Sequence, residues 1–589
     1  MPSTVEIQLQ ESSLQGRTLV AGRAESSLVF SNLGLSFWGG IEAFSGEVID
    51  RHHPLSGQFV NGKILAIPSG RGSCTGSSVM LELILNGHAP AGLILAEPDE
   101  ILTLGVLIAQ VVFQKSIPVV CLGHDAFLRL QDASAVRIED DIVTLLDEPS
   151  NVDRIEARYP CDTFIPDPRI RLSETDLDML NGRQGKAAQV AMELVLRMAS
   201  LQGARELIDV QQAHIDGCIY TGPASLRFAE QLVKWGGKVR VPTTLNSISV
   251  DKRKWRELGV DAALGEPASA LGDAYLDLGA RVSFTCAPYL LDTKPKLGEQ
   301  IVWAESNAVV FANSVLGART LKYPDYLDIS IALTGRAPSV GSHKDNGRRA
   351  TVRIDVHKPE GADDAFYPLL GYHIGLLATT GIPVVCGLED AQPSLDDLKA
   401  FSAAFATTSA APMFHMAGVT PEAPSAEAAL AGQLPLRHLS VSQDDLVRSW
   451  RELDSAPDQA VQLISLGNPH FSITECETLA SLCSDRQKHR DTELVVTMGR
   501  EIHEQAQAAG YVETLVRFGA TLITDTCWCM LGEPVIPRNA STIMTNSGKY
   551  AHYAPGLVGR GVRFGSLADC VEAACTSHVS GSLPGWLSA

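Results

Sequence analysis

Short apolar runs alternate with amphipathic segments through the first 150 residues. In chain order these are the apolar run Lys63–Pro68, a helical pattern from Ser77, the run Ala91–Leu95, a helical pattern over Ile101–Lys115 and the run Ile117–Leu122. An apolar run of four to eight residues bounded by turn residues is typical of a strand buried on both faces. The alternation predicts a layered β/α unit over residues 1–150.

The chain then changes character. Asp147–Asp167 carries three prolines and several charges without periodicity, and it is predicted to be a connector. A long helix is predicted from Ser173, because Val190, Leu194, Met198 and Leu201 recur at helical spacing. The glycines near residue 183 weaken the first part of this helix.

The remaining residues repeat the alternation of strands and helices. The predicted strands are Val461–Leu466, Leu494–Met498 and Thr521–Thr524, and the predicted helices are Ser225–Trp235 and Arg500–Ala509. The alanine-rich segment 425–433 fits either a helix or a surface insertion. The whole pattern predicts one small and one large α/β domain.

Charge and composition narrow the classes of function. The net charge of −20 disfavours binding to nucleic acid or to an anionic membrane, since both require basic surfaces. Polar residues and a proline interrupt the most apolar stretch, Ile101–Gly123, so no membrane span is predicted. The first residues lack a signal-peptide pattern, and the twelve cysteines include no paired CxxC motifs. We therefore expect a cytoplasmic protein with reduced thiols that acts on a small molecule; its oligomeric state stays open.

A glycine-rich loop, residues 68–78, joins the first predicted strand to the first predicted helix. Its backbone N–H groups and the helix N-terminus could hold an anion, and Arg71 could clamp a carboxylate. The alternative is a turn that caps the helix. No Gly-Lys-Ser/Thr closes the loop, so it is not a Walker A motif.

Further polar loops follow predicted strands. His214 and Asp216 lie in one, Thr244 and Asn246 in another, and Lys549 near the C-terminus. Taken alone, the first loop is better explained as a helix cap with a satisfied histidine, the second fits a plain strand end equally well, and a single lysine is usually a surface residue.

Three cysteines end apolar runs, where α/β folds collect ligands. They are Cys286, Cys386 and Cys527, and Asn468 with His470 ends a similar run. For any single cysteine, a buried core thiol is the simpler interpretation.

Together these segments resemble the aconitase X family, a branch of the aconitase superfamily. Seven motifs occur in the family's order between residues 5 and 580: Gly-Arg-Gly-Ser, His-x-x-Gly, Thr-Thr-Leu-Asn, Thr-Cys-x-Pro-Tyr, Gly-x-Pro-His, Asp-Thr-Cys and Thr-Asn-Ser-x-Lys-x-x-His-Tyr. Each motif is weak alone, whereas seven in order are specific.

The resemblance implies a fold and an activity. It implies a small swivelling β/α domain over residues 1–150 and a large aconitase-like α/β domain over residues 168–589. Fusion of both domains in one chain points to the type that dehydrates cis-3-hydroxy-L-proline, a hydro-lyase with a hydroxy amino acid as substrate. The two-subunit type, which dehydrates mevalonate 5-phosphate, is the alternative within the family.

The resemblance also implies an iron–sulfur cluster. The family's three cysteine ligands correspond to Cys286, Asn468 and Cys527, and an amide is a poor iron ligand beside thiolates. A [2Fe-2S] cluster is therefore expected rather than a four-iron cluster. Cys386 is the first candidate for the third ligand, ahead of Cys529 and Cys218.

Catalytic and substrate-binding residues follow by position. Ser73 matches the family's serine base, which Arg71 would help to ionise. Contacts to the substrate are expected from Arg71, His214, Gly217, Cys218, Ile219, Asn246, Ser247 and Lys549. Ile219 replaces a serine of the phosphomevalonate type, which favours a substrate without phosphate.

Two interpretations lie outside the family. One is a phosphate-handling ligase that uses the loop around Arg71, which would require nucleotide binding. The other is a non-catalytic binding protein for small acids. Either would be colourless when purified.

Overall fold

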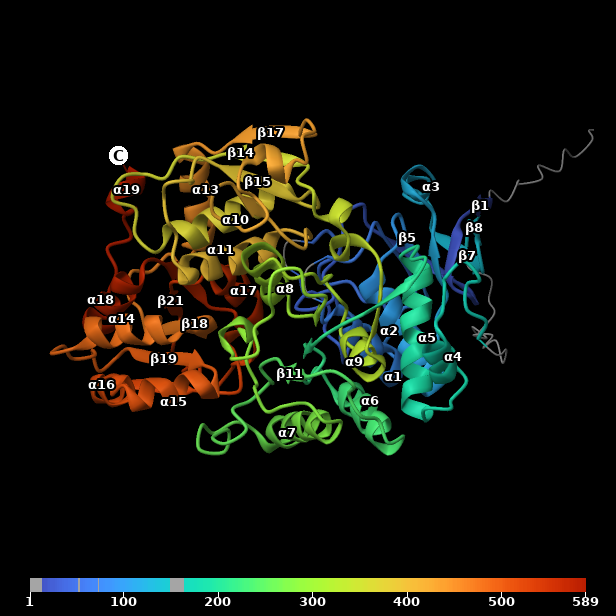
Figure 1. Cartoon of the computed structure of the whole chain (residues 1–589), viewed down its shortest axis with the longest axis horizontal. Coiled ribbons are helices and arrows are strands. Elements are labelled where there is room, and N and C mark those ends of the chain that lie inside the picture. The colour runs from blue at the N-terminus through green and yellow to red at the C-terminus, as the bar shows by residue number, and fades with distance from the viewer. Residues whose placement is uncertain (1–12, 51–52, 72–73, 149–163, 589) are drawn as a thin grey trace, which may run out of the picture. The chain divides into compact units, whose positions relative to one another are not determined.

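The computed structural model of the chain describes residues 13–50, 53–71, 74–148 and 164–588 (Figure 1). The chain divides into two units, Met1–Pro166 and Asp167–Ala589. No helix in the described residues combines the length and the apolar character that crossing a membrane requires.

The first unit is built on one eight-stranded sheet with the order β1-β8-β7-β3-β4-β5-β6-β2. Its strands are β1 (Ser13–Gln15), β2 (Arg17–Val20), β3 (Arg23–Phe30), β4 (Ile64–Ile67), β5 (Gly92–Leu95), β6 (Val119–Cys121), β7 (Ala135–Glu139) and β8 (Ile142–Leu146). Strands β3 to β6 are parallel, whereas β1, β2, β7 and β8 pair antiparallel with their neighbours.

The parallel part of this sheet confirms the predicted β/α alternation. Strands β4, β5 and β6 are fully buried, and helices α1 (Gly76–Asn86) and α2 (Glu100–Phe113) lie between them in sequence. The antiparallel part was not predicted. In β3 the segment Arg23–Ser27 pairs with β7, and it is too polar to show an apolar run. This segment is a strand because it pairs with β7, although its residues show no strand pattern.

A buried carboxylate fixes the loop after β4. Asp99 accepts hydrogen bonds from the backbone N–H of Gly70 and of Leu102, both at 2.7 Å. The second bond caps α2. Burial raises the pKa of Asp99 above its usual range, and the backbone donors oppose that shift. One side chain therefore holds both the glycine-rich loop and a helix start.

We expect Asp99→Ala to destabilise the protein by about 1–3 kcal/mol, because two buried backbone donors lose their acceptor. Thermal unfolding would show this as a lower midpoint for the transition of the first unit. Asp125→Ala, at an exposed position in the first turn of α3 (His124–Leu128), is the control and should change stability by less than about 0.5 kcal/mol. Equal midpoints for the two variants would contradict this role of Asp99.

The second unit contains three parallel sheets and one antiparallel pair, β13-β9. The parallel orders are β11-β10-β12, β16-β15-β14-β17 and β20-β19-β18-β21-β22. The strands are β9 (Leu207–Asp209), β10 (Ala213–Ile215), β11 (Thr243–Leu245), β12 (Val302–Trp303), β13 (Arg336–Pro338), β14 (Val352–Asp355), β15 (Pro383–Cys386), β16 (His415–Met416), β17 (Arg437–Ser440), β18 (Leu463–Phe471), β19 (Glu493–Met498), β20 (Ala520–Ile523), β21 (Thr542–Thr545) and β22 (Gly561–Phe564).

The three strands predicted in the C-terminal part are confirmed as β18, β19 and β20. Strand β18 runs further than predicted, to Phe471, with an irregular register against β19 after Leu466. The extension carries Asn468 and His470 along the strand's carboxyl end.

The long helix predicted from Ser173 is two helices, α4 (Glu174–Leu180) and α5 (Lys186–Leu201). Ser173 caps α4 as expected: its hydroxyl accepts the N–H of Asp176 at 3.2 Å. Gly182 and Gly185 lie between the helices with φ of 73° and 95°. An L side chain rarely adopts these angles, so the turn interrupts the helix.

The other helices of the second unit pack around its sheets. They are α6 (Pro223–Lys234), α7 (Ala262–Asp277), α8 (Ser306–Phe311), α9 (Leu327–Thr334), α10 (Phe366–Ala378), α11 (Leu395–Thr408), α12 (Ala426–Ala429), α13 (Gln443–Leu453), α14 (Ile473–Cys483), α15 (Arg500–Ala508), α16 (Tyr511–Phe518), α17 (Gly548–Val558), α18 (Leu567–Thr576) and α19 (Gly585–Ser588). Helices α6 and α15 confirm predicted helices, and the alanine-rich segment forms only the single turn α12. Helices α10 and α11 lie between the sheets of β14 and β18, and one apolar core joins all four elements (Figure 1).

Candidate functional site

Polar residues gather where the sheet β11-β10-β12 ends. Asp216 and Asn246 directly follow β10 and β11, and Glu305 follows β12 after one residue. The strands are parallel, so these residues leave the same edge. The Asn246 amide donates to the Asp216 carboxylate, and its oxygen accepts the backbone N–H of Ser247 at 2.7 Å.

A buried carboxylate and a tyrosine hold the loop after β10. Asp328 of α9 accepts the backbone N–H of Asp216 at 2.7 Å and that of Gly217 at 3.2 Å. The Tyr275 hydroxyl donates to the Gly217 carbonyl at 3.0 Å. A Cβ on Gly217 would lie 3.1 Å from that hydroxyl oxygen, so a side chain here would displace the tyrosine.

Acidic groups crowd this edge. Burial raises the pKa of Asp216 well above its usual value, and the nearby carboxyls of Asp325, Glu305 and Asp328 raise it further. Burial also raises the pKa of Asp328 to about 6, against the effect of its backbone donors. The site therefore favours positive charge at this edge, whether from protons or from a cationic group.

Lys549 supplies one positive charge. It lies in the first turn of α17, and its Nζ is 2.7 Å from Oε1 of Glu305. Burial acts to lower the pKa of Lys549, but Glu305 and three cysteine sulfurs raise it well above its usual value. The lysine therefore connects the acidic edge to the cysteines and keeps its charge at neutral pH.

Three thiols meet beside Lys549. Hydrogen bonds from the thiols of Cys286 and Cys529 lower the pKa of Cys527 well below its usual value, and the Ser247 hydroxyl adds to this. Cys529 also receives a hydrogen bond from Nδ2 of Asn468 at 3.3 Å. Of the three thiols, Cys527 is therefore the one whose charged form the surroundings favour. In the described residues no three His, Cys, Asp or Glu side chains surround a single-ion position.

The structure separates Cys386 from these thiols, contrary to its expected place as third ligand. Cys386 ends β15 in another sheet and packs in an alanine-rich core with Ala350, Val384 and Ala417. Burial raises the pKa of its thiol to about 11. Cys529, two residues after Cys527, is the third thiol of the group instead. Cys386 ends a strand of a different sheet, so two cysteines at strand ends need not belong to one site.

Two other residues expected to contact substrate, His214 and Cys218, instead bond to neighbouring parts of the protein. His214 lies inside β10, where Nδ1 bonds Thr244 Oγ1 at 2.8 Å and burial lowers the ring's pKa to about 3. The Cys218 thiol donates to the carbonyls of Ile215 at 3.4 Å and Asn246 at 3.5 Å. Both side chains therefore brace the loops. Ile219, also in this loop, is buried.

Two predicted site residues belong to the glycine-rich loop of the first unit. Arg71 forms an ion pair with Asp50, with 2.7 Å between Nη2 and Oδ2. Ser73 lies outside the described residues.

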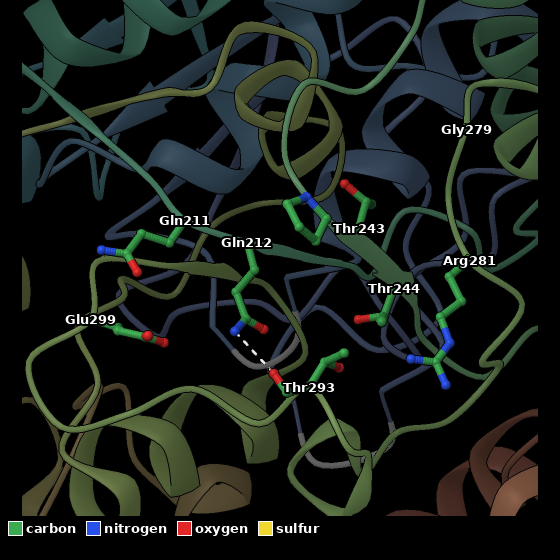
Figure 2. A pocket seen from close by; sticks show the side chains of 9 residues that line it. Gln211, Gln212, Thr243, Thr244, Gly279, Arg281, Thr293 and Glu299 are labelled. Carbon is green, nitrogen blue, oxygen red and sulfur yellow. Dashed lines mark hydrogen bonds between the residues drawn. The ribbon is translucent and has the colours of Figure 1, made fainter.

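A pocket of about 420 Å³ lies at the other end of the β10-β11 pair (Figure 2). Gln212, Thr243 and Arg281 help to line it, and Gln212 donates to the Thr293 carbonyl at 3.0 Å. The carboxylates of Asp292 and Glu501 balance the charge of Arg281. None of the predicted site residues lines this pocket.

Sequence reasoning missed several members of the site. Asp216 was noted only as a possible cap, Cys529 only as a weak substitute, and Glu305 and Asp328 not at all. Glu305 has a detectable signal, because it closely follows a short buried strand, as Asp216 does. Asp328 has none, since it lies within a helix.

Comparisons with known proteins identify the family. The chain matches the aconitase X swivel domain at residues 13–145, and the aconitase X first, second and third domains at residues 169–346, 350–451 and 461–576. The crystal structure of Thermococcus kodakaraensis aconitase X in its holo form is 30% identical, with a TM-score of 0.61, and covers 69% of this chain and 100% of that one. The predicted combination of a swivel domain with a larger aconitase-like domain is therefore confirmed.

Curated relatives extend over the whole chain. A protein of Pseudomonas aeruginosa named cis-3-hydroxy-L-proline dehydratase is 58% identical over 97% of this chain and 98% of its own length. A protein of Hypocrea jecorina with the same name is 53% identical over 98% of each. The phosphomevalonate dehydratase large subunit of Methanothermobacter thermautotrophicus is 33% identical over 66% of this chain. These relatives and the four matched domains show that the chain is a hydro-lyase and belongs to the aconitase X family.

Proposed function

We propose that this enzyme dehydrates cis-3-hydroxy-L-proline to Δ1-pyrroline-2-carboxylate. The observation that carries the proposal is the identity of 58% and 53% to two dehydratases of that name, over 97% and 98% of this chain. The phosphomevalonate dehydratase subunit is only 33% identical and matches 66% of the chain.

The charges of the site support an amino-acid substrate. Hydroxyproline carries a carboxylate and a ring ammonium, and the site offers Lys549 for the first and the carboxyls of Asp216 and Glu305 for the second. One donor of the Lys549 ammonium goes to Glu305, which leaves two for a ligand. A phosphate group would instead bring further negative charge towards crowded carboxyls. Ile219, which has no hydroxyl to offer a phosphate, agrees with this choice.

We assign the cluster ligands to Cys286, Cys527 and Cys529. Thiolates are the usual ligands of iron–sulfur clusters, and the sulfurs of Cys286 and Cys529 already lie within hydrogen-bonding reach of Cys527. Asn468 approaches the group as a donor to Cys529, which suits a supporting residue better than a fourth ligand. The [2Fe-2S] cluster that the family resemblance implies would be held by these three thiolates, with Asn468 supporting Cys529. When bound, its iron supplies a Lewis acid for the departing hydroxyl.

The chain's own residues bind the substrate and move its proton. Lys549 holds the carboxylate, and Asp216, fixed by Asn246, holds the ammonium. Ser73, assigned from the family resemblance, removes the proton from C2, and the 3-hydroxyl leaves as hydroxide, which becomes water by taking up the proton that Ser73 has removed. The resulting enamine gains a proton at C3 and loses one from nitrogen to give the imine product. The burial of Asp216, Asn246 and Glu305 keeps these groups out of bulk water.

The proposal is tested with protein purified without oxygen. We expect a coloured enzyme that contains iron and sulfide and turns over cis-3-hydroxy-L-proline, but not mevalonate 5-phosphate. Product is followed by trapping the imine. Turnover of the phosphorylated substrate alone would overturn the substrate assignment. A colourless protein that binds nucleotide would instead support the ligase alternative.

A further inference from the structure

One buried histidine contacts the residues that directly precede Cys286 and Cys527. His470 is fully buried, in the strand β18, and its ring lies between the segments Thr285–Cys286 and Thr526–Cys527. Ring atom Nδ1 lies 3.1 Å from Thr285 Oγ1, and Nε2 lies 2.8 Å from the Thr526 carbonyl oxygen. These segments are about 240 residues apart in sequence, so a shared partner bridges a long chain separation.

The partners determine the ring's tautomer. A carbonyl oxygen only accepts, so Nε2 carries the hydrogen and Nδ1 accepts from the Thr285 hydroxyl. The same hydroxyl oxygen accepts the backbone N–H of Ala287 at 3.1 Å. Burial lowers the pKa of His470, which keeps the ring in this neutral form.

The backbone of His470 is held as well. Its N–H donates to the Cys286 sulfur at 3.3 Å, and its carbonyl accepts from the Lys399 ammonium at 3.2 Å. Lys399 is buried and paired with Glu475 and Asp396. Every polar group of His470 therefore has a partner, and Lys399 holds its backbone carbonyl.

We propose that His470 is a positioning residue that sets the spacing between Cys286 and Cys527. It does so through its ring, while its backbone N–H stabilises the Cys286 sulfur directly. This positioning role serves the proposed cluster and in that respect rests on the proposed function. The spacing itself is a property of the protein and can be measured without metal.

The test measures thiol spacing in metal-free, reduced protein. Dibromobimane bridges two neighbouring thiols, and peptide mass spectrometry identifies the bridged pair. We expect the Cys286–Cys527 bridge in the unaltered protein and a several-fold lower yield in His470→Ala. Thr285→Val removes the hydroxyl that bonds Nδ1 and the Ala287 N–H, and it should also lower the yield. Thr285→Ser keeps the hydroxyl and should give the yield of the unaltered protein.

A second buried histidine provides the matched control. His415 in β16 also directs Nε2 to a backbone carbonyl, that of Arg348 at 2.7 Å, but it lies in the sheet of Cys386. His415→Gln should leave the bridge yield unchanged. Unchanged yields in His470→Ala and Thr285→Val, with both proteins folded by circular dichroism, would overturn the proposal.

Iron content separates this inference from the proposed function. After reconstitution, the variants with low bridge yield should lose iron to a chelator faster than the unaltered protein and show a shifted absorption spectrum. If the unaltered protein takes up no iron, the cluster assignment fails, but the bridging yields still decide the role of His470. Normal bridging with fast iron loss would contradict the positioning role alone.

Discussion

Cys527→Ala is expected to abolish bound iron and all measurable dehydration. Cys527 is the sulfur that both other thiols contact, and its pKa is lowered by hydrogen bonds from Cys286 and Cys529. Removing it takes away the site's thiolate and the partner that orients the other two. A cluster held by three thiolates does not survive the loss of its central ligand. Iron and sulfide analysis with an absorption spectrum would measure the effect.

Cys386→Ala is the matched control, since it also removes a buried thiol from a strand end. We expect it to keep full iron, because Cys386 packs against alanines in a different sheet. Its cost should be limited to a small cavity, about 1–2 kcal/mol of stability. Cys529→Ala should lose iron like Cys527→Ala. Iron loss in Cys386→Ala with retention in Cys529→Ala would reverse the ligand assignment.

Ser73→Ala is expected to lower turnover by about 10²–10⁴-fold, the usual effect of removing a general base. The change deletes one oxygen and no thiol, so iron content and colour should stay normal. Exchange of the substrate's C2 proton with deuterated solvent should fall in parallel, because that step needs the same base. Nuclear magnetic resonance of the recovered substrate would follow the exchange.

Ser69→Ala, in the same glycine-rich loop, is the control for Ser73→Ala. It should retain turnover within a few-fold if Ser73 is the base. Near-normal turnover in Ser73→Ala would exclude this role, and a large loss in Ser69→Ala or Ser77→Ala would move the base to that residue. Because Ser77 already donates to the Cys74 carbonyl at 2.9 Å, a loss there would also need a stability measurement.

Local sequence was sufficient for some parallel strands of both units, namely β4, β5 and β6 in the first and β18, β19 and β20 in the second. A strand buried on both faces is largely apolar, so Ile64–Ile67 and Leu494–Met498 are visible as runs. Helix signals were equally local, as the Ser173 cap shows. The antiparallel strands escaped because one of their faces is partly exposed and their residues are mixed.

The sequence alone also determined the family and the positions of Cys286, Cys527, Asn246 and Lys549, because ordered motifs carry that information. It did not determine which further residues join them. The sequence ranked Cys386 ahead of Cys529 as a third thiol, and only the packing of separate sheets reversed that order. Asp328 and His470 act through contacts with loops more than 50 residues away in sequence. Such contacts depend on how strands and helices meet in space, and no local pattern of residues records that.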